Sequence, residues 1–187
     1  MTVWVLVAIG AVVGLWVIMT YNRLIGLRNQ TTNGWHQIDV QLKRRHDLIP
    51  NLVNTVRGAM EFERDTLTQV IEARARAVSA AGPADAARRE GELTQALGRL
   101  FALAENYPTL KSNENVKALQ EELASTENKV GSARQFYNDV ATQYNISQQT
   151  FPANLIASSF GFKAAELFEV ANEIERQVPT VDLSMRK

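Results

Sequence analysis

The uncharged beginning of the chain constrains its fold more than any other feature. The first 22 residues carry no charged side chain, and positions 3–21 are almost entirely apolar. A helix over these positions, rising about 1.5 Å per residue, matches the hydrocarbon core of a bilayer, which is about 30 Å thick. A cleaved signal peptide has a basic beginning, a shorter apolar centre and a small-residue cleavage site, and the segment shows none of these. We therefore predict a permanent transmembrane anchor over residues 1–22.

Aromatic and basic residues around the anchor predict its ends and its orientation. Trp4, Trp16 and Tyr21 place rings at or near the two membrane interfaces, with Trp16 a turn inside the boundary. Basic residues occur only after the anchor, beginning with Arg23 and Arg28. Because Lys and Arg beside a membrane span favour the cytoplasmic side, we expect the N-terminus outside and the C-terminal body in the cytoplasm.

A pair of glycines inside the anchor has the spacing of a helix-dimerisation motif. Gly10 and Gly14 form GxxxG, which lets two helix backbones approach closely inside a membrane, where dispersion forces drive association. Glycine is also common in membrane helices in general, so chance produces the same spacing. The sequence leaves open whether Gly10 and Gly14 mediate self-association.

Charge and cysteine content exclude several classes of function. Twenty basic and twenty acidic residues cancel, so the chain has no overall positive field to attract a nucleic acid, and we expect no nucleic-acid partner. The absence of cysteine excludes disulfides, thiolate metal sites and a thiol nucleophile. The length of 187 residues suits one domain with an appendage.

Apolar periodicity after the anchor predicts helices and no strands. The chain is expected to be all-α, with the single transmembrane helix followed by an antiparallel bundle of about four long helices with coiled-coil-like packing over residues 23–178. The first helix is expected to continue from the anchor to about Val78, with a kink or a new start at Pro50, which lacks a backbone N–H. Residues at spacings of three and four form its seam, predicted to be a bundle or oligomer interface: Trp35, Ile38, Leu42, Arg45, Ile49, Leu52 and Val56.

The remaining helices are predicted from their caps and breaks. The stretch over residues 79–87 contains Gly82-Pro83, which predicts a turn followed by the start of a second helix with Asp85 in its first turn, and this helix ends at Pro108. Ser112 or Asn113 is expected to cap a third helix that runs to about Tyr144. A last helix is expected over residues 155–177, with a break near Gly161 as an alternative, before a flexible tail over residues 179–187. Because the second helix is too short to cover the first, part of the first should be covered by another subunit or stand as a solvated stalk.

Basic residues in the middle of the first helix have structural and membrane-binding interpretations. Arg45, at a seam position, is expected to reach Glu121, Glu122 or Glu127 on a facing helix and to fix the register, while Lys43 and Arg44 face solvent. A role in binding lipid headgroups is disfavoured for Lys43, Arg44 and Arg45. A continuous helix puts these residues about 30 Å from the membrane interface, several times the ~8 Å screening length. A sharp bend near Gly34, or a helix lying flat on the membrane, would restore the membrane interpretation.

Candidate catalytic and metal-binding residues do not assemble into a site. His36 and His46 are too far apart in sequence for a helical zinc motif, and no Glu-x-x-His tetrapeptide accompanies the carboxylates. There is no phosphate-binding glycine loop and no nucleophile elbow. We therefore expect no enzymatic activity, no cofactor and no bound metal.

The stretch over residues 140–162 contains no charged side chain and concentrates apolar residues around a proline. It is expected to form a corner that closes the end of the bundle, with a docking patch for a neighbour as the alternative. The residues of this patch are Phe151, Leu155, Ile156, Phe160 and Phe162.

Five blocks of sequence, in order along the chain, resemble the LemA family. They are YNRLIGLRNQ, WHQIDVQLKRRHDLIPNLVNTVRG, ENYPTLKSNENVKALQEEL, ARQFYNDVATQYN and FPANLIASSFGF. The resemblance implies a single-pass bacterial inner-membrane protein with a bundle of long helices and no established enzymatic activity. Some members of the family are associated with magnetosome membranes. Ala59 and Met60 depart mildly from the more aromatic sequence expected at that position.

These observations together favour a non-enzymatic, membrane-anchored scaffold. The expected partners are the lipid bilayer, further copies of the chain and other membrane proteins. Two alternatives are a regulator or adaptor of a membrane protease and a membrane-remodelling module. A convergent set of titratable groups would have favoured an enzyme or protease regulator, and the sequence offers none.

Overall fold

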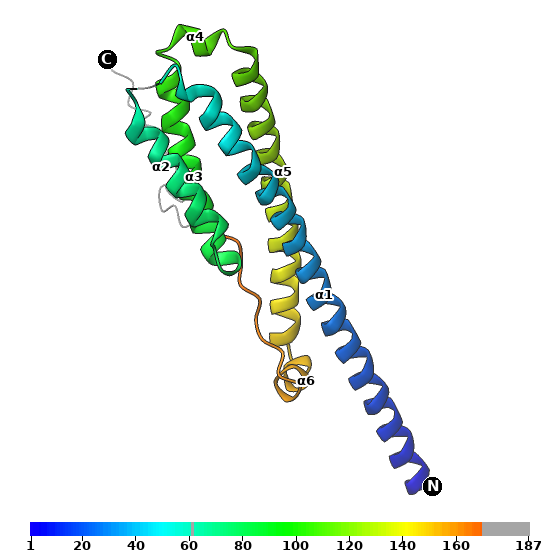
Figure 1. Ribbon diagram of the computed structural model, residues 1–187. Helices are drawn as coiled ribbons and strands as arrows, with labels where there is room; N and C mark the ends of the chain where they lie inside the picture. The colour runs from blue at the N-terminus through cyan, green and yellow to red at the C-terminus, as the bar shows by residue number, and fades with distance from the viewer. Residues whose placement is uncertain (61, 170–187) are drawn as a thin grey trace, which may run out of the picture.

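The protein is described by a computed structural model, which places residues 1–60 and 62–169. These residues form helices and no strand, which confirms the all-α prediction (Figure 1). The helices are α1 (Thr2–Arg57), α2 (Arg64–Val78), α3 (Gly82–Ala104), α4 (Pro108–Lys111), α5 (Glu114–Gln149) and α6 (Ala153–Ser159).

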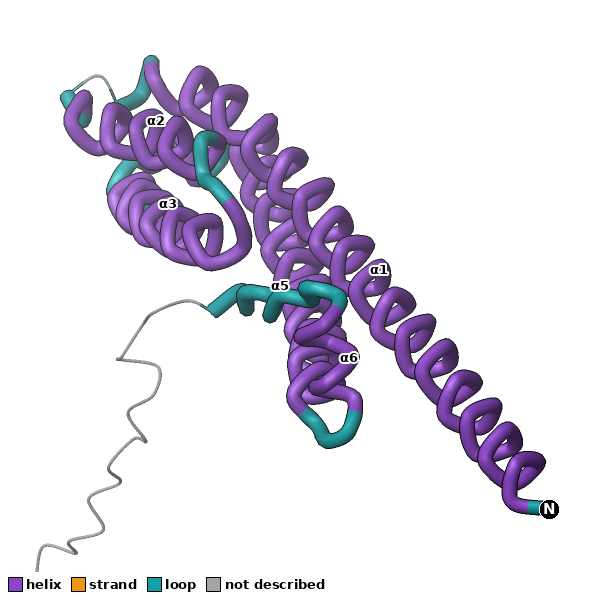
Figure 2. The backbone as a smooth tube through the Cα atoms, turned by 90° about the horizontal axis from the view of Figure 1, so that it is seen from below, coloured by secondary structure: helices purple, strands orange, loops and turns teal. Residues whose placement is uncertain are grey.

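The helices pack around α1, which is much the longest element of the fold. In Figure 1, α2 and α3 form an antiparallel hairpin beside its C-terminal half, while α5 returns along it from the far end. The short α6 lies at the opposite end of α5, and the N-terminal part of α1 projects beyond the bundle (Figures 1 and 2).

Two apolar cores lie along this bundle. The first is built from all four long helices and includes Ile49, Leu52 and Val56 of α1. The second includes Ile38 and Leu42 of α1, the beginning of α3, the middle of α5 and Phe168. Burial in these cores removes the seam of α1 from water, which is the main stabilisation available to a chain without cysteine.

Local signals explain where α3 and α5 begin. Gly82 has a φ of +80°, a left-handed conformation that glycine adopts without strain, and Pro83 occupies the first turn of α3. The Asn113 side chain caps α5 by accepting hydrogen bonds from the backbone N–H groups of Asn115 (2.9 Å) and Val116 (3.3 Å). Both starts agree with the sequence prediction.

The prediction of one helix running to Val78 was wrong. α1 ends at Arg57, and the chain turns after Gly58, a poor helix former, before α2 begins at Arg64. The turn brings the Met60 side chain into the first core, where it is fully buried. Burial of this side chain and of one face of α2 favours a reversal over a longer, solvated helix.

Of the two outcomes predicted at Pro50, a kink or a new start, the new start was wrong, since Pro50 lies within α1. Proline cannot donate to the carbonyl four residues earlier, which here belongs to His46. Arg74 of α2 supplies the missing donor, with its Nε 2.7 Å from the His46 carbonyl oxygen. A side chain from a neighbouring helix therefore compensates for the proline.

The last predicted helix is much shorter than expected. α6 ends at Ser159, Gly161 follows with a φ of +69°, and residues 163–169 have no helical structure. The break near Gly161 agrees with the alternative given above. Residues 170–178 of the predicted bundle and the tail over 179–187 lie outside the described residues.

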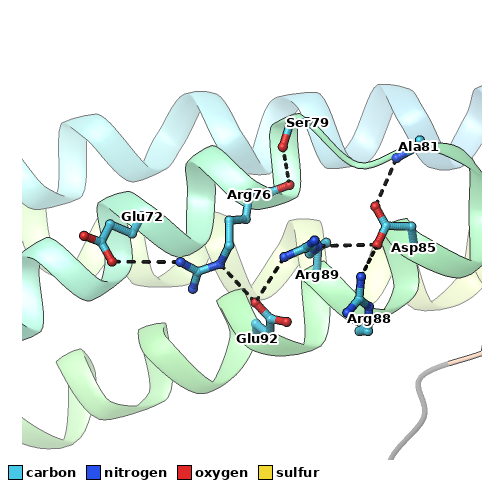
Figure 3. A network of polar contacts seen from close by, with 8 residues as sticks. All are labelled: Glu72, Arg76, Ser79, Ala81, Asp85, Arg88, Arg89 and Glu92. Carbon is cyan, nitrogen blue, oxygen red and sulfur yellow. Dashed lines mark hydrogen bonds and ion pairs between the residues drawn. The ribbon is translucent and has the colours of Figure 1, made fainter.

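The α2–α3 hairpin carries a network of ion pairs on its outer surface (Figure 3). Arg76 of α2 contacts Glu92 of α3 at 3.1 Å, and Asp85 accepts hydrogen bonds from Arg88 and from the Ala81 N–H. The hydrogen bond from Arg88, followed by that from Ala81, lowers the pKa of the Asp85 carboxyl. Because these side chains are largely exposed, the network fixes geometry more than it adds stability.

Candidate functional site

The anchor and the bundle share one uninterrupted helix. α1 contains a stretch of mean hydropathy 2.4 that is long enough to cross a membrane, and none of this stretch is buried within the protein. A Cβ added at Gly10 or Gly14 would meet nothing within 4 Å, so both glycines remain open to a neighbouring helix. Because α1 has no break before Arg57, the apolar stretch and the bundle are joined by continuous helix.

A buried polar layer separates the two apolar cores. The Arg45 guanidinium lies 3.1 Å from Glu90 and 2.8 Å from Glu127, and it donates a hydrogen bond to the Thr94 hydroxyl at 2.9 Å. The second oxygen of the Glu90 carboxylate lies 2.5 Å from His46 Nε2. The Arg45 and Glu90 side chains are only 5 % and 6 % exposed. One carboxylate on α3 thus binds two neighbouring residues of α1.

This layer is suited to fixing helix register. Both oxygens of Glu90 are engaged by side chains of α1, one by Arg45 and the other by His46. A buried charged pair that fits only one alignment disfavours sliding of α1 against α3 and α5. The structure places Arg45 beside Glu127, one of its three predicted partners, and pairs Glu122 with Arg44 instead, at 2.7 Å. The sequence prediction missed Glu90.

Two asparagines of α5 hold an extended segment over residues 163–168, the strap, against the bundle (Figure 2). The amide of Asn138 donates to the Phe168 carbonyl at 3.0 Å and accepts from the Phe168 N–H at 2.9 Å. Asn145, seven residues later, makes the same pair of hydrogen bonds with Ala165, at 2.9 and 2.8 Å. Each amide therefore satisfies both backbone groups of one strap residue, as a neighbouring β-strand would.

Two tyrosines beside these asparagines complete the attachment. The Tyr137 hydroxyl donates to the Glu166 carbonyl at 2.6 Å, and that of Tyr144 donates to the Lys163 carbonyl at 3.0 Å. Burial raises the pKa of both phenols, and the negative charge of Glu166 raises that of Tyr137 further. The repeated Tyr-Asn pair explains how α5 binds the strap: it recognises the strap's backbone.

The seam of α1 is covered within the chain. Of its seven predicted residues, Trp35 is partly buried and the other six are buried: Ile38, Leu42, Arg45, Ile49, Leu52 and Val56. The 36 residues of α5 cover the part of α1 that the second predicted helix was too short to reach. The seam therefore leaves no apolar surplus that a second copy must cover, and any self-association has to use other surfaces.

Residues 150–162, the corner, close the membrane-proximal end of the bundle. Ile156 is buried, while the Phe160 and Phe162 rings pack on Tyr21 of α1 with centroids 4.9 and 5.7 Å away. Three of the predicted docking residues nevertheless remain exposed, namely Phe151, Leu155 and Phe160. One face of the corner plugs the bundle, as predicted, while the other leaves apolar side chains exposed, and docking of a neighbour there stays a prediction.

A wide groove between α1 and α5, with a volume of about 1010 Å³, contains no reactive constellation. Its lining mixes apolar, polar and charged side chains from both helices, including Val40, Gln41, Glu121, Lys129 and Phe136. No group of three or more His, Asp or Glu side chains able to hold a metal ion occurs among residues 1–60 and 62–169.

Comparison with known proteins identifies the family. The model of the LemA family matches residues 34–183. The chain belongs to the LemA family. Similar members include the magnetosome protein MamQ 2 of Paramagnetospirillum magneticum (28 % identical, 81 % of this chain and 65 % of that protein) and MamQ of Magnetospirillum gryphiswaldense (25 %, with the same coverage). Protein LemA of Metamycoplasma hominis is 26 % identical over 83 % of this chain and 71 % of its own.

The match spans 65 % of the length of the MamQ proteins, so these relatives extend beyond the region compared. The long exposed apolar helix and the LemA-family relatives fit a membrane-anchored bacterial protein. The blocks that carry the family resemblance also acquire physical roles here. They contain Arg45 of the buried polar layer and the Tyr-Asn pairs that hold the strap. They also contain Pro50, whose missing hydrogen bond to the His46 carbonyl is replaced by one from Arg74.

Proposed function

We propose that this LemA-family protein is a non-enzymatic scaffold of the bacterial inner membrane that self-associates through its anchor and organises membrane proteins or lipids. The N-terminus lies outside, and the bundle stands in the cytoplasm. The observation that carries the proposal is the continuity of α1, a single helix from Thr2 to Arg57. Because no flexible linker intervenes, contacts between anchors fix the spacing and direction of the cytoplasmic bundles.

Three further observations support this proposal. Gly10 and Gly14 are open to a neighbouring helix, and Arg23 and Arg28 follow the membrane span with no basic residue before it. Glu90 holds α3 to Arg45 and His46 of α1, and the amides of Asn138 and Asn145 hold the strap. The MamQ relatives are named as magnetosome proteins, and we extend to this chain only a role in organising a membrane.

Self-association can be tested on the full-length protein in a mild detergent. Light scattering, corrected for bound detergent, should give a protein mass that is a multiple of the 20.8 kDa chain. The double variant Gly10→Leu and Gly14→Leu should return the mass to one chain, because bulky side chains keep the backbones apart.

A matched control uses the opposite face of the same helix. At 100° per residue, Val5 and Val12 lie about half a turn away from the two glycines, so Val5→Leu and Val12→Leu should leave the mass unchanged. A wild-type particle of one chain would refute self-association through the anchor. Accessibility of single cysteines introduced on either side of the anchor tests the proposed orientation.

A further inference from the structure

The corner presents an apolar surface that the protein itself does not cover. Phe151, Leu155 and Phe160 are 77 %, 59 % and 60 % exposed, although neighbouring Ile156 and Ala157 are buried. Three large exposed apolar side chains within ten residues, in α6 and at its two ends, form a concentrated patch rather than scattered surface residues. Such a patch usually marks an interaction site.

The position of the patch along α1 indicates what it contacts. Phe160 packs on Tyr21, which is the last residue of the apolar run that starts at Val3. At about 1.5 Å per residue this run measures about 28 Å, close to the thickness of the hydrocarbon core. Tyr21 therefore lies where α1 leaves the hydrocarbon, and the corner lies at the same depth. Residues 2–15 of α1 are exposed, and partial burial begins at Trp16.

The charges around the corner complement a phospholipid surface. Residues 1–38 and 140–165 contain only three charged side chains, all of them basic, namely Arg23, Arg28 and Lys163. Arg28 lies over the Phe162 ring, 5.9 Å from its centroid, which places a guanidinium beside the corner. Basic side chains at this level attract lipid phosphates, and no acidic residue in these two stretches opposes them.

We propose that the corner is a second membrane contact, in which Phe151, Leu155 and Phe160 enter the boundary between headgroups and acyl chains of the leaflet from which α1 emerges. The occupant of the patch is phospholipid rather than a protein, because the continuous α1 holds the patch at the bilayer surface in every molecule. The contact fixes the tilt of the bundle relative to the membrane. It rests on the membrane anchoring in the proposed function but not on self-association, so a monomeric particle would leave the lipid contact untouched.

Single cysteines can measure the depth of the corner, because the chain has none of its own. Phe151→Cys and Leu155→Cys alter exposed side chains and should preserve the fold, which circular dichroism checks. Each full-length variant carries a spin label and is placed, one copy per disc, in nanodiscs of phosphatidylcholine and phosphatidylglycerol. Ser112→Cys, exposed at the far end of the bundle, is the matched control.

The corner labels should collide often with oxygen and rarely with a water-soluble nickel complex, at a depth about 5–10 Å into the interface. The Ser112 label should show the reverse. Corner labels as accessible to nickel as the Ser112 label would overturn the proposal, because the patch would then face water. Labels shielded from both reagents would also overturn it, because the patch would then be packed against protein.

Discussion

The hydrogen bond from Arg74 to the His46 carbonyl is what allows Pro50 inside α1, and this dependence can be measured. Arg74→Met keeps most of the aliphatic stem of the side chain but removes the donor, leaving the carbonyl without the bond of 2.7 Å. An unsatisfied, partly buried carbonyl, or the loss of a hydrogen bond from a charged donor, costs about 1–3 kcal/mol. We expect the free energy of unfolding to fall by that amount.

The proline makes a sharper test possible through a double-mutant cycle. In a Pro50→Ala background, the backbone N–H of residue 50 can donate to the His46 carbonyl, as in any helix. Arg74→Met should then cost less than about 1 kcal/mol, and the difference from its cost in the wild-type background is the coupling between positions 50 and 74, expected to be about 0.5–3 kcal/mol. Denaturant unfolding of the full-length protein in detergent, followed by circular dichroism, measures the stability of all four proteins in the cycle.

A matched control lies two residues further along α2. Arg76 is 45 % exposed and makes only surface ion pairs, so Arg76→Met should cost no more than about 1 kcal/mol. An equal cost of Arg74→Met in the wild-type and Pro50→Ala backgrounds would refute the reasoning. The arginine would then act through packing or charge, without regard to the proline.

Three further outcomes follow from the polar contacts. Glu90→Ala should destabilise the bundle by about 3–5 kcal/mol in the same denaturant assay, because it leaves the buried Arg45 guanidinium poorly compensated. Glu127→Ala, at a half-exposed carboxylate, should cost less than about 1 kcal/mol. Asn145→Ala should speed tryptic cleavage after Lys163 by loosening the strap, and unchanged cleavage would show that the asparagine is dispensable there. Burial raises the pKa of the Tyr137 phenol above the value of about 10 that tyrosine has in the unfolded chain. The neutral phenol therefore stabilises the fold below pH ~10, and this stabilisation is lost as the pH rises through the pKa of the folded state. Tyr137→Phe should therefore cost about 0.5–1.5 kcal/mol at neutral pH and progressively less above pH ~10.

The elements that the sequence predicted well are those set by local chemistry. The cap at Asn113 and the Gly82-Pro83 start act within a few residues of the helix ends they define. The seam of α1 was visible because burial repeats at the period of the helix. The anchor was visible because its composition is extreme.

The errors arose where distant side chains decide the backbone. Pro50 remains helical because of Arg74, which belongs to a helix whose position the sequence does not show. The strap is extended because Asn138 and Asn145 bind its backbone from residues 20 to 30 positions away. Glu90 was missed as a partner of Arg45 because its place depends on how the α2–α3 hairpin folds back. Periodicity and propensity record none of these long-range contacts.

The proposed self-association and the proposed lipid contact use one side of α1 at different depths. Gly14 and Tyr21 are seven residues apart, so they lie on nearly the same stripe of the helix, and Tyr21 is the residue on which the corner packs. At about 1.5 Å per residue, Gly14 lies about 10 Å deeper in the membrane than Tyr21. A second anchor can thus approach the glycines within the hydrocarbon, while the corner occupies the membrane interface nearer the bundle. A partner helix that crosses at the glycines at an angle of about −40° diverges toward the bundle, which leaves room for the corner of each copy.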